Sequence, residues 1–507
     1  MAGLISSLHN SSGALKVHSK GLEVVGKNLA NINNRNYAKQ RVEIGDRGQI
    51  NTDIATESMG VEAMGLRQNR DALLDKSVMR ELTATASLEA TQKVIQNAET
   101  ALGQFLDRTK DSTSIQNALR SGGGGISDAL TDFFNAWESV SVKPGDIGEK
   151  QLLLEKAKIL AEKINQTDQR LKQVQLDVDE QVNTDVGVVN GILNEIAKIN
   201  EYIAKAELVK PYSAVDLRDQ RQAKLEELSK YIDVQFGPVE VTPATNPPQV
   251  DPNGLGQIFV RSGGIPLVDR KTVFGQTQNP DGSPNGPFTY NSANRTLQYD
   301  SDGNGPTASV IFNSSGKIQA QLDSTSTTGS VQVARNDIDK LAKQLTSSVN
   351  VAYNLNLAPD KQTKFFSDPP TGLKVQFNTS ITSANLRTSD QVGGGNQTAL
   401  RVAAIGTKIF STITPTPPDF IDGSFTAFFN KTVTTVAQQL SSTNIRLEDQ
   451  KLSEQNAINS RDQYSGVSQD EEITDMMKFQ RSFQASARHI NVLDTLLEQV
   501  VNRLGVG

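Results

Sequence analysis

Apolar residues repeat every seven positions at both ends of this chain, and the two repeats lie more than 400 residues apart. The first repeat consists of Leu8, Leu15, Leu22 and Leu29, with Leu4, Ser11, His18, Val25 and Ile32 at the companion positions. The second repeat consists of Met476, Phe483, Ile490, Leu497 and Leu504, with Phe479, Ser486, Leu493 and Val500 at the companion positions. A heptad repeat of this kind predicts a helix that packs along a partner helix.

Each predicted terminal helix requires a partner, and the most economical partner is the helix at the other end. Such pairing makes a coiled coil of the two termini and leaves the intervening residues as a looped-out body. The alternative is that each apolar stripe packs on its own core, as a single amphipathic helix does. The presence of a stripe at both ends favours pairing.

The first half of the intervening chain has a helical pattern. The predicted helices cover 70–120, a segment from Ser127 to Lys143, 149–209 and 219–230. Ser127 is a suitable N-cap, because it follows the interruption made by Ser121 and four glycines. Phe133, Phe134 and Trp137 form an aromatic face that we assign to the core.

The second half changes character and then becomes helical again. Between 234 and 312, prolines and glycines alternate with short β-prone runs, which predicts a β-rich insertion. The segments that follow are helix over 330–353, a mixed and proline-dotted stretch over 358–422, and helix from 425 almost to the end. A break at 465–467 precedes a capping box, in which the side chain of Glu471 reaches back to the amide of Ser468.

The predicted fold class is therefore mainly α with a β-rich insertion. The predicted domains are a terminal coiled-coil axial domain of 1–36 with 465–507, a helical middle domain of 37–233 with 317–464, and an outer β-rich insertion domain of 234–316. Within the middle domain, residues 358–422 are mixed and irregular.

Composition narrows the function. Of the 507 residues, 36% are hydrophobic and 5% aromatic, which suits long helices with polar surfaces better than deep ligand pockets. The net charge is −6 with lysine and arginine scattered among acids, so we expect no nucleic-acid or anionic-membrane partner. No run approaches the roughly 18 apolar residues that span a bilayer, and the start of the chain lacks the features of a secretory signal peptide. The chain has no cysteine and hence no thiol chemistry.

Catalytic and metal-binding patterns are absent from the sequence. The histidines His9, His18 and His489 match no common zinc spacing, so we interpret them as surface or seam residues. No His-Glu-x-x-His or Gly-x-Ser-x-Gly motif occurs. The acidic residues considered for catalysis are Asp216, Asp219, Asp470, Glu471 and Glu472, which we interpret as solvated helix caps and i,i+4 partners. We therefore expect no enzyme, no cofactor and no metal site.

Both ends carry a specific signature as well as a heptad repeat. From Asn28 to Val42 the chain resembles the N-terminal signature of bacterial flagellar rod, hook and hook-associated proteins, in which a helix runs into Ala30-Asn31 and a turn ends at Tyr37. Asn34 and Asn36 stand where the family usually has threonine and glycine, and asparagine tolerates a left-handed backbone.

The C-terminal end resembles the same family through Ser465-Gly466-Val467 and the run Gln484-Ala485-Ser486-Ala487-Arg488. Internal stretches favour its hook-associated, junction-forming members. These stretches are Phe133 to Trp137, Asp216 to Arg221, and Ser315 to Ile318.

The resemblance implies a structural component of the extracellular flagellum that connects hook and filament, exported through the flagellar type III apparatus without a cleaved signal. The implied partners are further copies in a ring, the hook protein, the second junction protein on the filament side and a cytosolic export chaperone at the C-terminal helix. The expected assembly interface consists of Leu8, Leu15, Leu22, Leu29, Ala30, Asn31, Tyr37, Met476, Phe479, Phe483, Ile490, Leu493, Leu497 and Leu504.

Three other functions remain open at this point. A hook or distal-rod protein shares the terminal signatures, but its body is mostly β, whereas this body has a helical pattern. An enzyme carried by the insertion requires a motif between 234 and 312, and the sequence offers none. A coiled-coil adaptor unconnected with flagella would leave motility intact when its gene is deleted.

Overall fold

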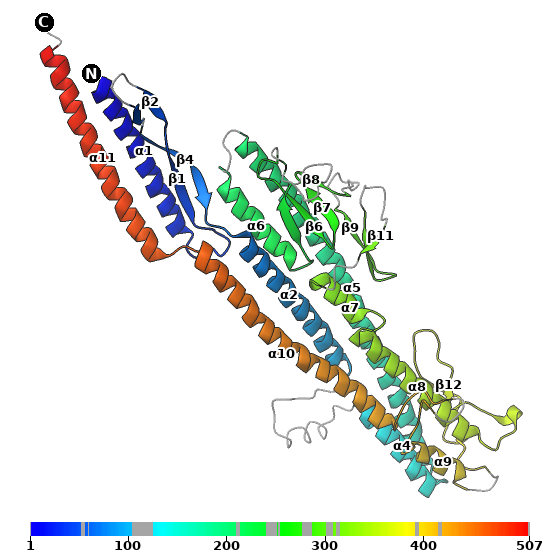
Figure 1. Ribbon diagram of the computed structural model, residues 1–507. Helices are drawn as coiled ribbons and strands as arrows, with labels where there is room; N and C mark the ends of the chain where they lie inside the picture. Colours follow the sequence, from blue (N-terminus) through cyan, green and yellow to red (C-terminus); the bar gives the residue numbers. More distant parts are fainter. Residues whose placement is uncertain are drawn as a thin grey trace.

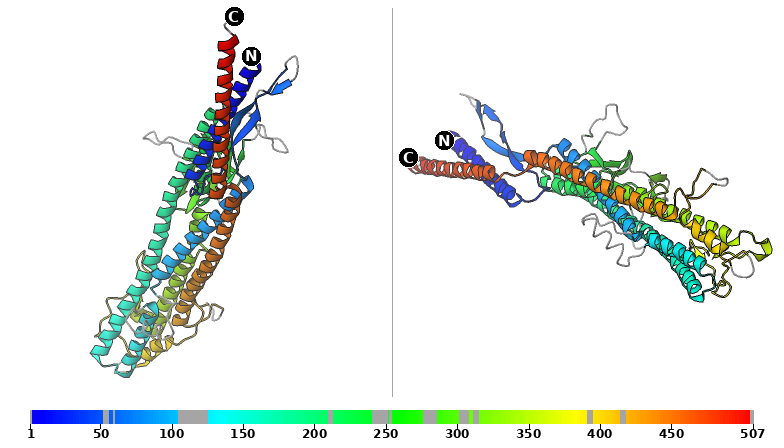
Figure 2. Two further views of the ribbon diagram at one scale, coloured as in Figure 1. Left: turned by 90° about the vertical axis from the view of Figure 1, so that its left-hand side faces the viewer. Right: turned by 90° about the horizontal axis from the view of Figure 1, so that it is seen from below.

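The paired termini predicted from the heptad repeats are present in the structure, which is a computed structural model. It describes residues 2–51, 56–58, 60–103, 125–208, 213–239, 251, 254–275, 286–300, 308–310, 315–390, 395–413 and 418–504. Helix α1 (Ala2–Ala30) packs along α11 (Gln469–Leu504), and the two run antiparallel, so that both ends of the chain lie at one end of an elongated molecule (Figures 1 and 2). The fold is mainly α, as predicted.

The body consists of long helices laid side by side (Figure 1). Its described α-helices are α2 (Ala72–Ala101), α4 (Ile126–Val142), α5 (Ile147–Glu207), α6 (Val215–Ser229), α7 (Lys317–Thr325), α8 (Ser330–Asn354), α9 (Gln397–Ile405) and α10 (Phe425–Ser465). Helix α10 runs along α2, and the 61-residue α5 contacts α4, α6, α7 and α8. At a rise of 1.5 Å per residue, α5 is about 90 Å long, and it is the longest described helix of the body.

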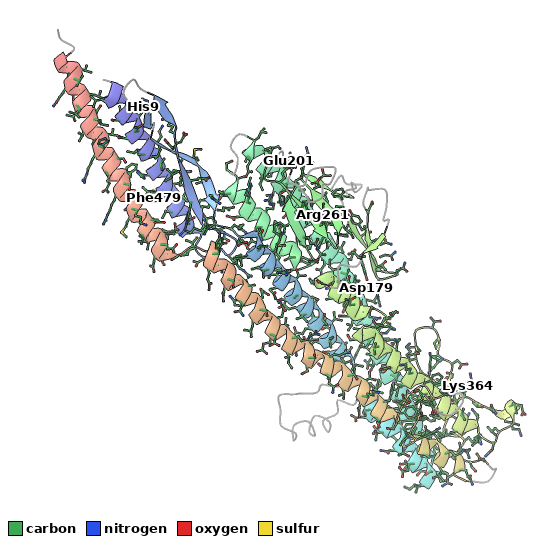
Figure 3. The ribbon with its side chains drawn as sticks, viewed as in Figure 1. His9, Asp179, Glu201, Arg261, Lys364 and Phe479 are labelled. Carbon is green, nitrogen blue, oxygen red and sulfur yellow. The ribbon has the colours of Figure 1, made fainter. Side chains whose placement is uncertain are left out.

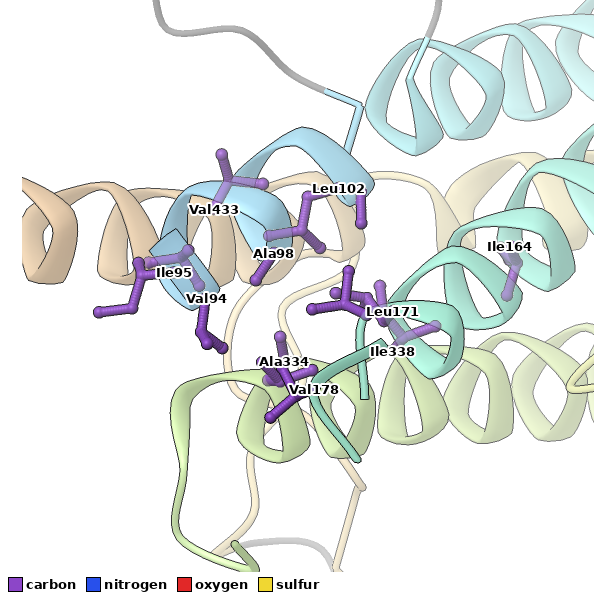
Figure 4. Close-up of a cluster of buried hydrophobic side chains, with 14 of the residues drawn as sticks. Val94, Ile95, Ala98, Leu102, Ile164, Leu171, Val178, Ala334, Ile338 and Val433 are labelled. Carbon is purple, nitrogen blue, oxygen red and sulfur yellow. The ribbon is translucent and has the colours of Figure 1, made fainter. Parts of the chain in front are cut away.

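One hydrophobic core runs through these helices. In the part shown in Figure 4, the core includes Ala98 of α2, Leu171 of α5, Ile338 of α8 and Val433 of α10. Towards the far end, Phe133 and Trp137 of α4 are fully buried, and the Trp137 ring lies 5.4 Å from that of Phe365. The prediction that this aromatic face belongs to the hydrophobic core is therefore confirmed.

Some predicted helix ends differ from the structure. Helix α2 ends at Ala101, and residues 104–124, which include the predicted glycine interruption, lie outside the described residues. Helix α4 begins at Ile126, so Ser127 is not its N-cap; Gly125 holds that position without a side-chain bond. Helix α6 begins at Val215, four residues before the predicted start, because Val215 is buried and extends the apolar face.

The described part of the insertion contains two small antiparallel sheets that pack on α5. One has the order β5 (Gln235–Pro238), β6 (Ile258–Ser262), β7 (Ile265–Asp269), β8 (Thr272–Val273), and the other β11 (Ala308–Val310), β10 (Thr296–Tyr299), β9 (Phe288–Asn291). Asn190 and Asn200 of α5 donate to the backbone oxygens of Phe288 and Ile258, at 2.8 and 3.1 Å. The insertion thus shares its core with the helical body. A further short pair, β12 (Phe366–Ser367) with β13 (Gln376–Phe377), and a 3-10 turn, η1 (Pro359–Lys361), lie in the mixed stretch.

An antiparallel hairpin that the helical pattern did not predict lies beside α1. Strands β1 (Gln40–Asp46) and β4 (Val61–Gln68) pair with Val42 opposite Leu66, and β2 (Gln49–Asn51) and β3 (Thr56–Ser58) extend the hairpin. Both long strands contact α1. Strands β1 and β4 therefore lie against α1, whereas the sequence analysis placed both in the helical middle domain; the domain division itself stays a prediction.

Candidate functional site

The heptad face of α11 is the face that meets α1. Its predicted residues Met476, Phe479, Phe483, Ile490 and Leu497 are half-buried, and Leu493 is the most buried, at 5% exposed. The side chain of Leu504 lies outside the described ones. Figure 3 places Phe479 on the part of α11 that runs beside α1.

The buried face of α1 is not centred on its leucines. Leu8, Leu15, Leu22 and Leu29 are only half-buried, Ala30 is exposed, and Asn31 is half-buried. The buried residues are instead Val17, Gly21, Val24, Val25 and Asn28. The reason is that α1 touches α11 and the β1–β4 hairpin at once, so the face between these two contacts is the one removed from water. The leucine stripe is therefore a flank of the helix pair.

Two contacts set the register of the pair. A Cβ atom added to Gly21 would lie 2.6 Å from the Phe479 ring, so this glycine forms the hole that admits the phenylalanine. The His18 ring lies 6.3 Å from the same ring, and burial lowers the pKa of His18. About two helical turns nearer the body, Asn28 contacts Glu472. His18 is thus a seam residue, as predicted.

The helix pair meets the body at the segments 31–39, 69–71 and 466–468, which we call the elbow; the chain crosses between pair and body in the last two of them. Asn28 is the centre of its hydrogen bonds. The Asn28 Nδ2 donates to Gln40 O at 3.0 Å and to Glu472 Oε2 at 2.9 Å. The Asn28 Oδ1 accepts from Tyr37 Oη at 2.8 Å and from Gln40 N at 3.1 Å. All four residues are buried.

Lys39 brings a buried positive charge to the elbow. Its side chain is 5% exposed, and its Nζ lies 2.9 Å from Glu472 Oε1 and 2.7 Å from Glu471 Oε2. Burial opposes the charge, but the pairs with Glu471 and Glu472 raise the pKa of Lys39 above its usual range. The Lys39 backbone N donates to Ser465 O at 2.9 Å, so the same residue also holds the end of α10.

Arg70 holds the elbow to the body. Its guanidinium donates to Asp75 at 3.1 Å, to Asp219 at 2.7 Å and to Asn36 O at 2.9 Å. Burial raises the pKa of Asp219 to about 6, although the Arg70 charge opposes the rise.

Arg461 of α10 makes a second link between elbow and body. It donates to Glu226 of α6 at 2.6 Å and to Arg35 O at 3.1 Å. Both side chains of this ion pair are more than nine-tenths buried.

The elbow corrects our interpretation of the acidic residues. Asp219 and Glu472 are buried rather than solvated, and Asp216 binds Lys27 and Gln40 across the chain. In the capping box, the Glu471 carboxylate pairs with Lys39. Asp470 is exposed in the first turn of α11, as predicted. Tyr37, predicted as an interface residue, is buried inside the elbow.

Among the described residues, no group of three or more histidine, cysteine, aspartate or glutamate side chains is arranged to hold a metal ion. No described helix is long and apolar enough to cross a membrane.

Comparison with known proteins identifies relatives of this architecture. The family model of the flagellar hook-associated protein FlgK helical domain matches residues 112–366, which is half of the chain. The model of the flagellar basal body rod FlgEFG protein C-terminal region matches residues 460–504.

Individual relatives agree with these matches. Flagellar hook-associated protein 1 of Bacillus subtilis strain 168 is 23% identical over 541 aligned positions that cover both chains completely. The protein of the same name from Salmonella typhimurium is 23% identical over 234 positions, 45% of this chain and 39% of its own. The structure of the flagellar hook junction protein FlgK from Burkholderia pseudomallei aligns with a TM-score of 0.41 and 19% identity, over 59% of this chain and 47% of that one.

Proposed function

Because this chain belongs to the family of the flagellar hook-associated protein FlgK, we propose that its antiparallel helices α1 and α11 are the surface through which copies assemble. The chain is a structural protein of the bacterial flagellum and forms the hook–filament junction. Its helical body, which the FlgK helical-domain model matches over residues 112–366, favours this family over the rod proteins, whose C-terminal model matches residues 460–504.

The observation that carries the proposal is apolar surface left over after α1 and α11 have paired. On α11, the large apolar side chains of Ile473, Met477, Val492 and Leu496 remain exposed. On α1, the leucine stripe is only half-buried. Exposed apolar surface along a helix pair indicates further contacts. In a ring, each copy would use one such face against the unlike face of its neighbour.

The remaining assignments follow from the family. The ring of copies receives the hook protein on one side and the second junction protein on the other. The exposed face of α11 is the binding surface for a cytosolic export chaperone, and the chain leaves the cell through the flagellar type III apparatus without a cleaved signal. The function assigned to the chain is mechanical and includes no catalytic step.

Substitution in the terminal helices tests the proposal in cells that lack the native gene. Leu22→Asp or Leu497→Asp is expected to give hooks without filaments, whereas the neighbouring exposed Glu498→Gln supports filament growth. Fluorescence of Trp137, the single tryptophan, checks that the body of each purified variant is folded. Normal filaments from both leucine variants would contradict the proposal.

The position of the protein provides an independent measurement. Labelled protein on isolated flagella is expected at the junction between hook and filament. Label along the hook or rod would instead support the hook or distal-rod alternative, and normal motility after gene deletion would support an unrelated adaptor.

A further inference from the structure

A cavity of about 600 Å³ lies where β4, α6 and the start of α2 meet, and Phe236 of the insertion lines one part of it. All of its lining residues belong to the described part of the chain. Four arginines line the cavity together with two carboxylates, those of Glu43 and Asp75. These arginines are Arg67, Arg70, Arg218 and Arg221. The wall of the cavity therefore carries more positive than negative charge.

Two of the four arginines are neutralised by carboxylates of the chain itself. The Arg70 guanidinium lies 3.1 Å from the Asp75 carboxylate and 2.7 Å from that of Asp219. The Nε and Nη2 of Arg218 both donate to Glu207 Oε1, at 3.0 and 2.9 Å. Because Asp75 is already paired, it does not serve as a counter-charge for the other two arginines.

Arg221 is a buried cation whose described partners are neutral. It is 7% exposed, and its Nη1 donates to Asn200 Oδ1 at 2.8 Å and to Gly256 O at 2.9 Å. Its other two nitrogens donate to no described residue, and no described carboxylate forms an ion pair with it. Burial lowers the pKa of Arg221 to about 9, and the nearby charge of Arg218 acts in the same direction. A buried charge held by neutral groups alone is unfavourable, so a bound anion would stabilise it.

Arg67 brings a second unpaired cation to the same cavity from β4. Its side chain is exposed and forms no hydrogen bond or ion pair with any described residue, Glu43 included. Its cross-strand partner in the hairpin is Arg41, and like charges directly opposite each other destabilise a strand pair. An anion bound beside Arg67 would reduce this repulsion as well.

We propose that the cavity binds a small oxyanion, a free phosphate or carboxylate, which Arg221 contacts at its buried end and Arg67 at its exposed end. Planar guanidinium groups suit this ligand, because each presents several N–H donors to the oxygens of one anion. The bound anion would link β4 of the hairpin to α6 of the body. The site lies within one chain, so it does not depend on the proposed assembly.

The test measures anion binding to the full-length chain by isothermal titration calorimetry. Inorganic phosphate and succinate are the two probes, and sodium chloride keeps the ionic strength constant. Arg221→Gln and Arg67→Gln each remove one of the unpaired charges. Arg47→Gln is the matched control, because Arg47 is an exposed arginine of the segment between β1 and β2 that does not line the cavity.

The native chain and Arg47→Gln are expected to bind phosphate or succinate in a saturable manner and with similar affinity. Arg221→Gln and Arg67→Gln should each weaken the binding by about tenfold or more, since each loses a charge-assisted contact. Bound anion should slow amide hydrogen exchange at residues 66–68 and 215–222 and leave exchange in α4 unchanged.

Arg67→Gln separates loss of binding from loss of folding. The Arg67 side chain has no described bond to lose, so amide exchange of this variant without anion should match that of the native chain. Phosphate also stabilises proteins in general by exclusion from their surfaces, an effect that does not saturate. Absence of saturable binding, equal binding by Arg67→Gln and Arg47→Gln, or equal protection of α4 would each overturn the proposal.

Discussion

Phe479 of α11 occupies space beside Gly21 of α1 that no other residue type would leave open, since a Cβ at position 21 would lie 2.6 Å from the ring. The glycine is therefore part of the helix–helix contact, even though glycine weakens a helix interior by about 1 kcal/mol relative to alanine. The local loss of helix stability is offset by the closer approach of the two helices.

Gly21→Ala should therefore destabilise the terminal helix pair, by about 1–3 kcal/mol, because the overpacked methyl group outweighs the better helix propensity. Gly26→Ala is the control, since position 26 is exposed on the same helix with no atom within 4 Å of the added Cβ. That variant should stabilise α1 by up to about 1 kcal/mol. Amide hydrogen exchange of α1 measures the effects of both substitutions. A stabilised α1 in Gly21→Ala would contradict the packing argument.

The buried ion pair between Arg461 and Glu226 should contribute far more to stability than an exposed pair between other residues of the body. Arg461→Met leaves the Glu226 carboxylate buried and unpaired, and we expect a loss of about 3–5 kcal/mol in the free energy of unfolding. Urea unfolding followed by Trp137 fluorescence measures this loss.

Lys451→Met serves as the comparison, because Lys451 of the same helix α10 pairs with Glu89 of α2 and both side chains are half-exposed. Its effect should stay below about 1 kcal/mol. The double variant Arg461→Met with Glu226→Met should recover most of the loss, since no charge then remains buried alone. Equal losses of unfolding free energy in Arg461→Met and Lys451→Met would show that burial of an ion pair does not determine its contribution to stability.

The features that the sequence predicted are those with local periodicity. The terminal pairing follows from the heptads, and the buried aromatic face of α4 follows from residues within two turns. The elbow has no such signal, because Asn28 and Glu472 stand 444 residues apart and only the fold brings them together. The centre of the buried face on α1 was likewise unpredictable, since it depends on the hairpin as well as on α11. A prediction based on the heptad repeat alone assumes that the helix packs against a single partner.

Asp219 should make the stability of the body depend on pH in the direction opposite to an ordinary salt-bridged carboxylate. Its pKa is raised to about 6 in the folded protein, so the folded state binds the proton more tightly than the unfolded chain does. The contribution of this group to stability is largest near pH 4 and decreases as the pH rises through 6. Relative to the native chain, Asp219→Asn should gain stability between pH 4 and 7, by up to about 3 kcal/mol.

Asp216→Asn should show the reverse trend in the same urea titrations. Burial opposes the charge of Asp216, but hydrogen bonds from Lys27 and Gln40 hold its pKa below the usual range. The stability contributed by this carboxylate is therefore present above its ordinary pKa and is lost as the pH falls through the lower, folded value. If the difference in the free energy of unfolding between the native chain and Asp219→Asn does not change with pH, the raised pKa of Asp219 is ruled out.

Val24 and Leu22 lie two residues apart on α1, but their replacement by aspartate should have different effects. Val24 is 3% exposed between α11 and the hairpin, so Val24→Asp buries an unpaired charge and should open the helix pair in the isolated protein, at a cost of about 3 kcal/mol or more. Leu22 is half-buried on the flank, so Leu22→Asp should leave the pair closed in solution and yet prevent incorporation into flagella. Amide exchange of α1 in the purified variants, followed by filament growth in cells, separates the two outcomes. If Leu22→Asp opens the pair as fully as Val24→Asp does, the leucine stripe belongs to the intramolecular contact and is not the surface offered to a neighbouring copy.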